Sequence, residues 1–114
     1  MIPEPDLARL QQWAEAQNSG LPESARDQIR YEIDVTDRTV TIVECRPPWN
    51  AAQDPDWTRL PVARLRYTKY LRHWSLYWSD RNSRFHECDL IEPTPDIEDL
   101  IAEVERDPTG IFWG

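Results

Sequence analysis

The chain has 114 residues, among them six Trp and ten Pro, and its formal net charge is -8 at pH 7. A chain of this length buries roughly two thirds of its unfolded surface, so we expect one domain with one core, and the aromatic content argues against disorder. It holds no apolar run near the ~18 residues of a membrane span, no basic-then-apolar leader, and only two Cys. We therefore expect a cytoplasmic protein that contacts no membrane and has no disulfide framework.

The charge is unevenly distributed along the chain. Residues 1–58 carry a net charge of -6 and residues 85–114 a net charge of -8, whereas residues 59–84 carry seven basic side chains and one acidic, a net charge of +6. Two interpretations are open: the acidic arms neutralise the basic segment, or the segment forms a binding face. The overall acidity argues against a protein that coats nucleic acid with its whole surface.

Residues 1–28 predict a helical N-terminal segment. Pro5 and Asp6 suit the start of a helix over residues 6–18, because proline fixes φ and an anion complements the positive end of the helix dipole. Asn18-Ser19-Gly20 is typical of a helix end. An apolar stripe recurs at spacings of three and four, formed by Leu7, Leu10, Trp13 and Ala14.

Between residues 29 and 91 the apolar period changes to two, which is typical of half-buried strands. Turn-forming residues separate these segments, and in Asp80-Arg81-Asn82-Ser83 the Asn suits a left-handed conformation. The pattern predicts strands over residues 29–35, 39–45, 62–69, 73–79 and 84–91.

A long loop is expected over residues 46–61. Four prolines restrict it and remove backbone donors, and loops of this length are often functional. Trp49 and Trp57 are expected to pack the loop against the body of the protein, since a packed loop is more common than a binding loop.

Residues 94–114 predict a C-terminal helix and an apolar tail. Thr94 is expected to cap the helix, with Pro95 in its first position. Ile97, Leu100, Ile101 and Val104 form an amphipathic stripe, whereas Glu98, Asp99, Glu103 and Glu105 are expected to be solvated. The tail residues are too apolar to remain in water, so we expect them to dock on their own domain or on a partner: Ile111, Phe112 and Trp113.

These elements predict an α+β fold. An antiparallel meander of about five strands carries an N-terminal and a C-terminal helix, both packed on one face.

The chain contains six distinctive motifs: TIVECRPPW at 41–49, DWTR at 56–59, ARLRY at 63–67, WSLYW at 74–78, DRN at 80–82 and DPTGIFWG at 107–114. Together they resemble a known family, the small actinobacterial proteins called domain of unknown function 3024. The resemblance runs from about residue 30 to the C-terminus, and one departure is Cys88, where an aromatic residue is expected. It implies a bacterial, actinobacterial source and supplies no activity, cofactor or site residue.

The Cys and His residues raise the question of a zinc site or a Cys–His nucleophile. His86 and Cys88 are two residues apart and would share a strand face, but Cys45 and His73 stand alone, without paired-cysteine spacing. Isolated cysteines in strands are usually small buried apolar groups. We therefore predict no metal ligand, no cofactor and no catalytic residue.

Carboxylates offer one further catalytic alternative. Glu32, Asp34 and Glu44, together with Arg64 or Lys69, have the residue types of a metal-dependent nuclease centre. Glu32 and Asp34 share the exposed parity of their strand, which solvation alone would also produce.

The strongest remaining signal is the basic hairpin over residues 62–79. Its arginines alternate with apolar residues, so guanidinium groups should face water while indoles face the core. Arg and Lys bind phosphates, and exposed Tyr stacks on bases. The sequence thus favours a non-catalytic binding module for an anionic partner, either nucleic acid or an acidic protein. The candidate binding residues are Arg64, Arg66, Lys69, Tyr70, Arg72, His73 and Tyr77.

The alternative is a structural or interaction protein. In this hypothesis the apolar tail, with Ile111, Phe112 and Trp113, docks on a second copy to form a homo-oligomer.

Overall fold

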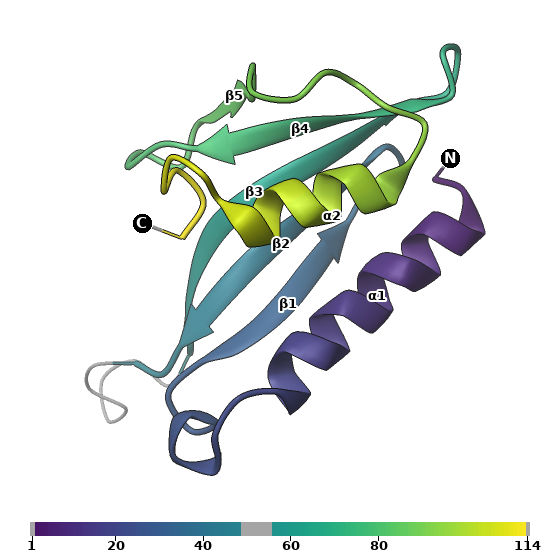
Figure 1. Ribbon diagram of the computed structural model, residues 1–114. Helices are drawn as coiled ribbons and strands as arrows, with labels where there is room; N and C mark the ends of the chain where they lie inside the picture. Colours follow the sequence, from purple (N-terminus) through teal and green to yellow (C-terminus); the bar gives the residue numbers. More distant parts are fainter. Residues whose placement is uncertain (1, 49–55, 114) are drawn as a thin grey trace.

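The computed structural model describes residues 2–48 and 56–113 (Figure 1). Two helices and five strands account for most of the described residues, and the molecule is about 48 Å long. In chain order the elements are α1 (Glu4–Ser19), the short 3-10 helix η1 (Glu23–Ala25), β1 (Arg30–Val35), β2 (Thr39–Arg46), β3 (Thr58–Thr68), β4 (His73–Ser79), β5 (Phe85–Glu87) and α2 (Ile97–Arg106).

The sheet is an antiparallel meander in the order β1-β2-β3-β4-β5, as the alternating pattern predicts. Its register aligns apolar residues across strands, with Ile42 opposite Ile33 on one side and Ala63 on the other. Leu65 continues the same set opposite Leu76. Because side chains alternate between the two faces, one face becomes almost entirely apolar.

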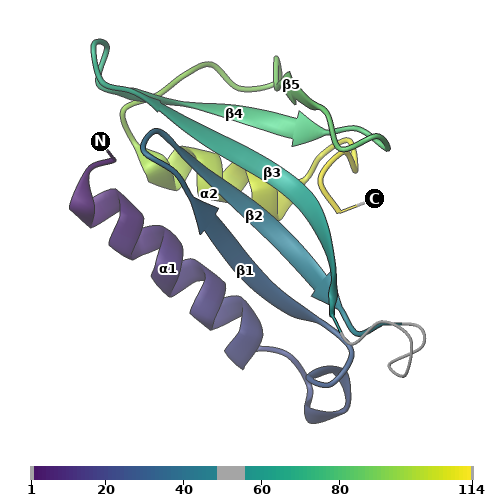
Figure 2. The same cartoon turned by 180° about the vertical axis from the view of Figure 1, so that it is seen from behind.

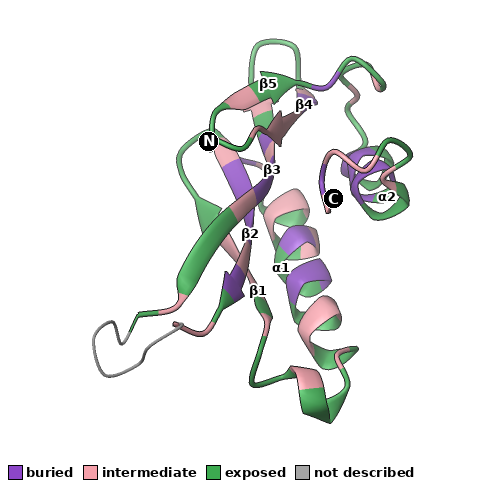
Figure 3. Cartoon of the chain, turned by 90° about the vertical axis from the view of Figure 1, so that its left-hand side faces the viewer, coloured by how far each residue is buried: buried purple, intermediate pink, exposed green. Residues whose placement is uncertain are grey.

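Both helices pack on that apolar face, which confirms the predicted α+β architecture. α1 lies along β1, and α2 lies over β4, so the opposite face of the sheet is left without a covering element in the described chain (Figures 2 and 3). We call this uncovered side the outer face. No helix among the described residues is long and apolar enough to cross a membrane.

α1 begins two residues earlier than predicted and buries the predicted stripe. Leu10, Trp13 and Ala14 are buried, and Leu7 is partly buried against them. At its end, Asn18 extends the backbone pairing of the sheet: its Oδ1 accepts from the Tyr31 N–H at 2.7 Å, and its Nδ2 donates to the Tyr31 carbonyl at 2.8 Å. This satisfies an edge-strand residue that would otherwise need water.

The loop prediction over residues 46–61 is wrong at its C-terminal end, because β3 already begins at Thr58. Pro61 lies inside β3, opposite Val43 at a β-bulge, whereas β4 pairs with β3 only from Ala63 onward. A proline is tolerated where the ladder is already irregular. Trp49 lies outside the described residues, and Trp57 is half-buried with the Arg30 guanidinium 4.3 Å from its ring centroid.

The turn and strand after β4 also differ from expectation. Ser83, rather than Asn82, adopts the left-handed conformation, with φ of 59°. Asp80 organises this turn, since its Oδ1 accepts from the backbone N–H groups of Asn82 and Arg84. β5 spans only three residues because the chain then turns inward and buries Cys88 in the core.

α2 buries its predicted stripe, but its cap is Asp96, which accepts from the Glu98 N–H at 3.0 Å. The predicted cap Thr94 and first helical residue Pro95 both precede the helix, because Thr94 pairs with Trp74 in an isolated bridge and its hydroxyl accepts from the Asp96 N–H at 3.1 Å. The predicted solvation of Glu103 is wrong: this residue is 4% exposed. It lies at the border of the apolar stripe, where Ile91 and its neighbours pass alongside the helix, and its Oε1 has no hydrogen-bond partner among the described residues.

Indole N–H groups connect the helices, the sheet and the tail. Trp74 on β4 donates to Asp6 of α1 at 2.8 Å, and Trp13 of α1 donates to Glu105 of α2 at 2.8 Å. Trp113 donates to the Val104 carbonyl at 2.9 Å and stacks on Trp13 with centroids 6.5 Å apart. The tail therefore packs on its own chain.

Candidate functional site: a basic patch on the outer face

The register places the predicted binding residues along one hairpin. Arg64 and Arg66 project from the outer face of β3, and Tyr77 lies opposite Arg64 on β4. The turn between β3 and β4 supplies the next three: Lys69, Tyr70 and Arg72. Arg72 closes this turn with φ of 52°, and its N–H donates to the Lys69 carbonyl at 3.2 Å. His73 begins β4 opposite Thr68 and is half-buried.

A further cation comes from the neighbouring turn between β1 and β2. The Tyr67 N–H donates to the Arg38 carbonyl at 2.8 Å, which fixes this turn beside the end of β3. Thr39, the next residue, lies opposite Arg66. We use the name basic patch for the five cations that the two turns and β3 bring together: Arg38, Arg64, Arg66, Lys69 and Arg72.

Two adjoining hollows run through the basic patch. The larger, of about 710 Å³, contains Lys69, Tyr70 and Arg72 among its lining residues. The smaller, of about 300 Å³, lies on the outer face between Arg64, Tyr77 and Phe85. Two residues line both hollows, Arg38 and Arg66, so these two arginines lie between the hollows and border each of them.

Within the described chain, none of the five cations forms an ion pair with a carboxylate. Arg64 donates from Nε to the Thr41 hydroxyl at 2.9 Å, and its guanidinium lies 3.9 Å from the Phe85 ring centroid. Such a contact orients the group without neutralising it. One carboxylate, that of Asp37, also lines the larger hollow, and it already has an interaction partner.

The other end of the outer face is arranged differently, although it also carries arginines. Arg59 contacts both Glu32, at 3.2 Å, and Asp34, at 2.5 Å. Arg30 lies 3.4 Å from the same Glu32 carboxylate, and the Cys45 thiol donates to it at 2.9 Å. That thiol hydrogen bond, together with the two nearby guanidinium groups, holds the pKa of Glu32 below its usual value.

This arrangement bears on the nuclease alternative. Glu32 and Asp34 converge on Arg59, and Glu44 pairs with Arg46 at 2.7 Å. None of the three carboxylates contacts Arg64 or Lys69 among the described interactions. These carboxylates therefore pair with Arg59 and Arg46 in the described chain, and not with the Arg64 or Lys69 that the nuclease alternative combines with them.

The Cys and His residues are separated. Cys45 is buried beside Glu32, and Cys88 is buried in the core. His86 is exposed, stacks on Trp78 with centroids 4.6 Å apart, and hydrogen-bonds Asp80 at 2.8 Å. The His86 hydrogen bond, followed by the backbone N–H groups of Arg84 and Asn82, lowers the pKa of Asp80 to about 2. No group of three or more potential metal ligands occurs in residues 2–48 and 56–113.

Sequence reasoning missed Arg38 and Phe85. Both lie outside the basic hairpin in the sequence and join it only through strand pairing. The available signal was the turn Thr36-Asp37-Arg38, which a meander places beside the second hairpin.

The fold defines the class: an α+β domain with a five-stranded antiparallel meander covered on one face by two helices. The chain belongs to the family described as Domain of unknown function (DUF3024), whose model matches residues 2–114. The match includes α1, which the resemblance found in the sequence did not cover. No curated protein and no solved structure matches the chain.

Proposed function

We propose that this protein is a small non-catalytic binding module whose basic patch engages an anionic partner, either nucleic acid or an acidic protein surface. The observation that carries the proposal is that five cations line two neighbouring hollows, and none of the five forms an ion pair in the described chain. Uncompensated cations in a hollow raise the local positive potential and attract anions.

The net charge of -8 does not oppose this function at short range. At physiological ionic strength the Debye length is about 8 Å, so distant carboxylates are largely screened. The arginines of the patch also present planar donor groups, which suit phosphate and carboxylate oxygens.

The tail is a weaker candidate for the contact surface. Phe112 is 7% exposed, and Ile111 and Trp113 pack against the same core. Self-association through these residues would have to replace the packing that they already make within their own chain. We expect deletion of residues 111–114 to lower the melting temperature without changing the mass in light scattering; a loss of mass from dimer to monomer would restore the self-association hypothesis.

The test is charge reversal at the two residues that both hollows share. Arg38→Glu combined with Arg66→Glu should weaken binding to labelled oligothymidylate, a DNA duplex or polyglutamate, whichever the native protein binds. We expect at least about a tenfold loss at low salt, because one charge-assisted hydrogen bond contributes about 1.5–3 kcal/mol and tenfold corresponds to about 1.4 kcal/mol.

The matched control is Arg81→Glu with Arg84→Glu, which changes the net charge equally at two exposed residues that line neither hollow. The control should retain most of the affinity. Equal losses in both double variants would reduce the effect to net charge, and no binding to any of the three probes would refute the function.

A further inference from the structure

We infer that the anionic partner is single-stranded nucleic acid, whose phosphates contact the basic patch while its bases stack on the aromatic rings beside it. This inference rests on the proposed function and names the partner of the same site. It depends on the position and exposure of three rings, those of Tyr70, Tyr77 and Phe85.

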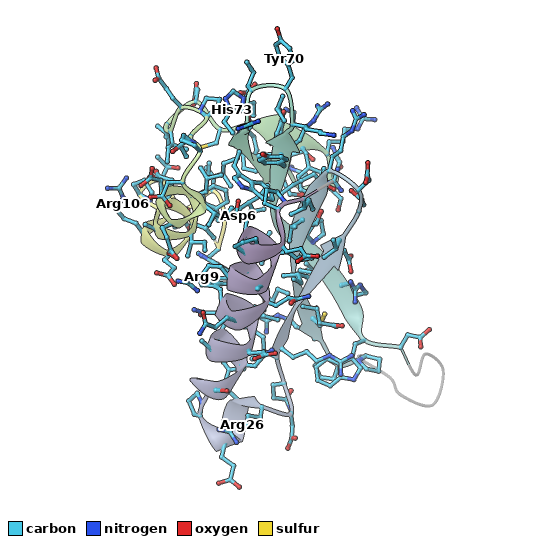
Figure 4. All side chains as sticks on the ribbon, turned by 90° about the vertical axis from the view of Figure 1, so that its right-hand side faces the viewer. Asp6, Arg9, Arg26, Tyr70, His73 and Arg106 are labelled. Atoms are coloured by element: carbon cyan, nitrogen blue, oxygen red, sulfur yellow. The ribbon has the colours of Figure 1, made fainter. Side chains whose placement is uncertain are left out.

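Tyr70 is the most exposed large apolar side chain among the described residues, at 93%. It lies at the tip of the β3–β4 turn and points away from the body, at the end of the molecule opposite Arg26 (Figure 4). No ring contact or hydrogen bond from its side chain occurs in the described chain. Packing does not require a ring there, whereas a base needs an unobstructed aromatic surface to stack on.

The other two rings lie at the far side of the basic patch. Tyr77 and Phe85 both line the smaller hollow, and both are half-buried on the outer face. The Arg64 guanidinium lies over the Phe85 ring, and Arg64 is opposite Tyr77 in the register, so a planar cation and two rings lie together. Bases stack on guanidinium planes as well as on aromatic rings.

Along the two hollows, an exposed aromatic ring comes first, then the shared cations, and then two further rings. Tyr70 is in the larger hollow, Arg38 and Arg66 are shared, and Tyr77 and Phe85 are in the smaller hollow. A charged backbone with unpaired bases matches this order. A duplex keeps its bases stacked inside, and an acidic protein uses the cations but has no need of the exposed rings.

The experiment measures fluorescence anisotropy of the full chain with a labelled 12-nucleotide oligothymidylate, a duplex of equal length and a polyglutamate peptide. Single-stranded DNA should bind most tightly. Tyr70→Ala should weaken that binding about fivefold or more, because base–aromatic stacking is worth about 1–3 kcal/mol.

Two control variants separate the effect of losing the Tyr70 ring from the effect of altering the turn that carries it. Tyr70→Phe keeps the stacking surface and should retain affinity, and Leu71→Ala truncates the neighbouring side chain, which is 58% exposed, without removing a ring. Tyr70→Ala should leave the weaker duplex and polyglutamate binding unchanged.

The outcomes separate this inference from the proposed function. If polyglutamate or the duplex binds as tightly as the single strand, or if Tyr70→Ala has no effect, the inference fails and the anion-binding function stands. If none of the probes binds, both fail.

Discussion

Both ends of the outer face carry arginines, but the arginines at one end form ion pairs and those at the other end do not, among the described residues. At the end formed by Arg30, Arg59, Glu32 and Asp34, which we call the paired end, each guanidinium lies within an ion pair. At the basic patch, the cations have no carboxylate partner in the part of the chain that the structure describes. A single strand, β3, contributes to both ends, since it holds Arg59 as well as Arg64 and Arg66.

The contrast shows that the ion pairs formed between side chains of nearby strands, rather than charge count or strand register alone, decide which cations remain available. Asp34 lies in the cross-strand row of Thr41 and Arg64, yet its carboxylate contacts Arg59. The small side chain of Cys45, opposite Arg30 and Arg59 on β2, lets groups from β1 and β3 meet above it. Arg64 is consequently left to Thr41 and Phe85.

The largest expected effect concerns what holds the basic patch in place without ion pairs. Trp74 is fully buried beneath the hairpin, 5.2 Å from the Tyr67 ring. Trp74→Ala should lower the free energy of unfolding by about 3–5 kcal/mol, because it leaves a large cavity. Chemical denaturation measures this loss.

The matched variant Trp74→Phe keeps most of the packing but removes the N–H that Asp6 accepts. It should cost about 1.5–3 kcal/mol, the usual effect of losing a hydrogen bond to a charged group. If Trp74→Ala lowered the free energy of unfolding less than Trp74→Phe, packing of Trp74 in the core would not be what stabilises the hairpin.

A smaller difference should separate two arginines of the same strand. Arg59→Ala removes the cation shared by Glu32 and Asp34 and should cost about 0.5–1 kcal/mol at low salt, since these groups are partly exposed and screened. Arg66→Ala should change stability by less than about 0.5 kcal/mol, as for other exposed residues. Equal costs in urea denaturation would break the comparison between the two ends.

The smallest expected effect is the pH dependence of the paired end. The pKa of Glu32 is lowered from its usual 4.5, chiefly by the Cys45 thiol and then by Arg59 and Arg30. A lowered folded-state pKa contributes stability that is complete above pH 4.5 and is lost as the pH falls through the folded value. The native chain should therefore lose stability on acidification below about pH 4.5.

Glu32→Gln should reduce this acid-dependent loss and leave the remainder, to which Asp80 contributes down to its pKa of about 2. Thermal melting from pH 7 to pH 3 measures both slopes. Identical slopes for the native chain and Glu32→Gln would contradict the role assigned to this carboxylate.

The fold was predictable because hydrophobic period is a local property. The stripe of Leu10 and Trp13, and the alternation around Leu65, follow from spacing alone. Pro61 misled the prediction of β3, since a β-bulge that accommodates proline depends on the partner strand. The prediction that Glu103 is solvated was wrong because its burial depends on residues 90–94, which follow β5 and lie beside α2.

The candidate site was only partly predictable. The hairpin residues, among them Arg66 and Tyr70, are contiguous in sequence, so alternation and turn chemistry place them together. The contribution of Arg38 and the separation of Arg59 from the other cations depend on pairing between strands. Side-chain ion pairing is set by distances that no local pattern encodes.

The most direct test of the central claim is the salt dependence of oligothymidylate binding for Arg66→Ala and Arg59→Ala. Each phosphate contact contributes about 0.7 to the slope of log affinity against log salt for a single strand. We expect Arg66→Ala to reduce the slope by about this amount and Arg59→Ala to leave it unchanged. An equal reduction in both variants, or none in either, would contradict the claim that only the unpaired cations of the basic patch bind the partner.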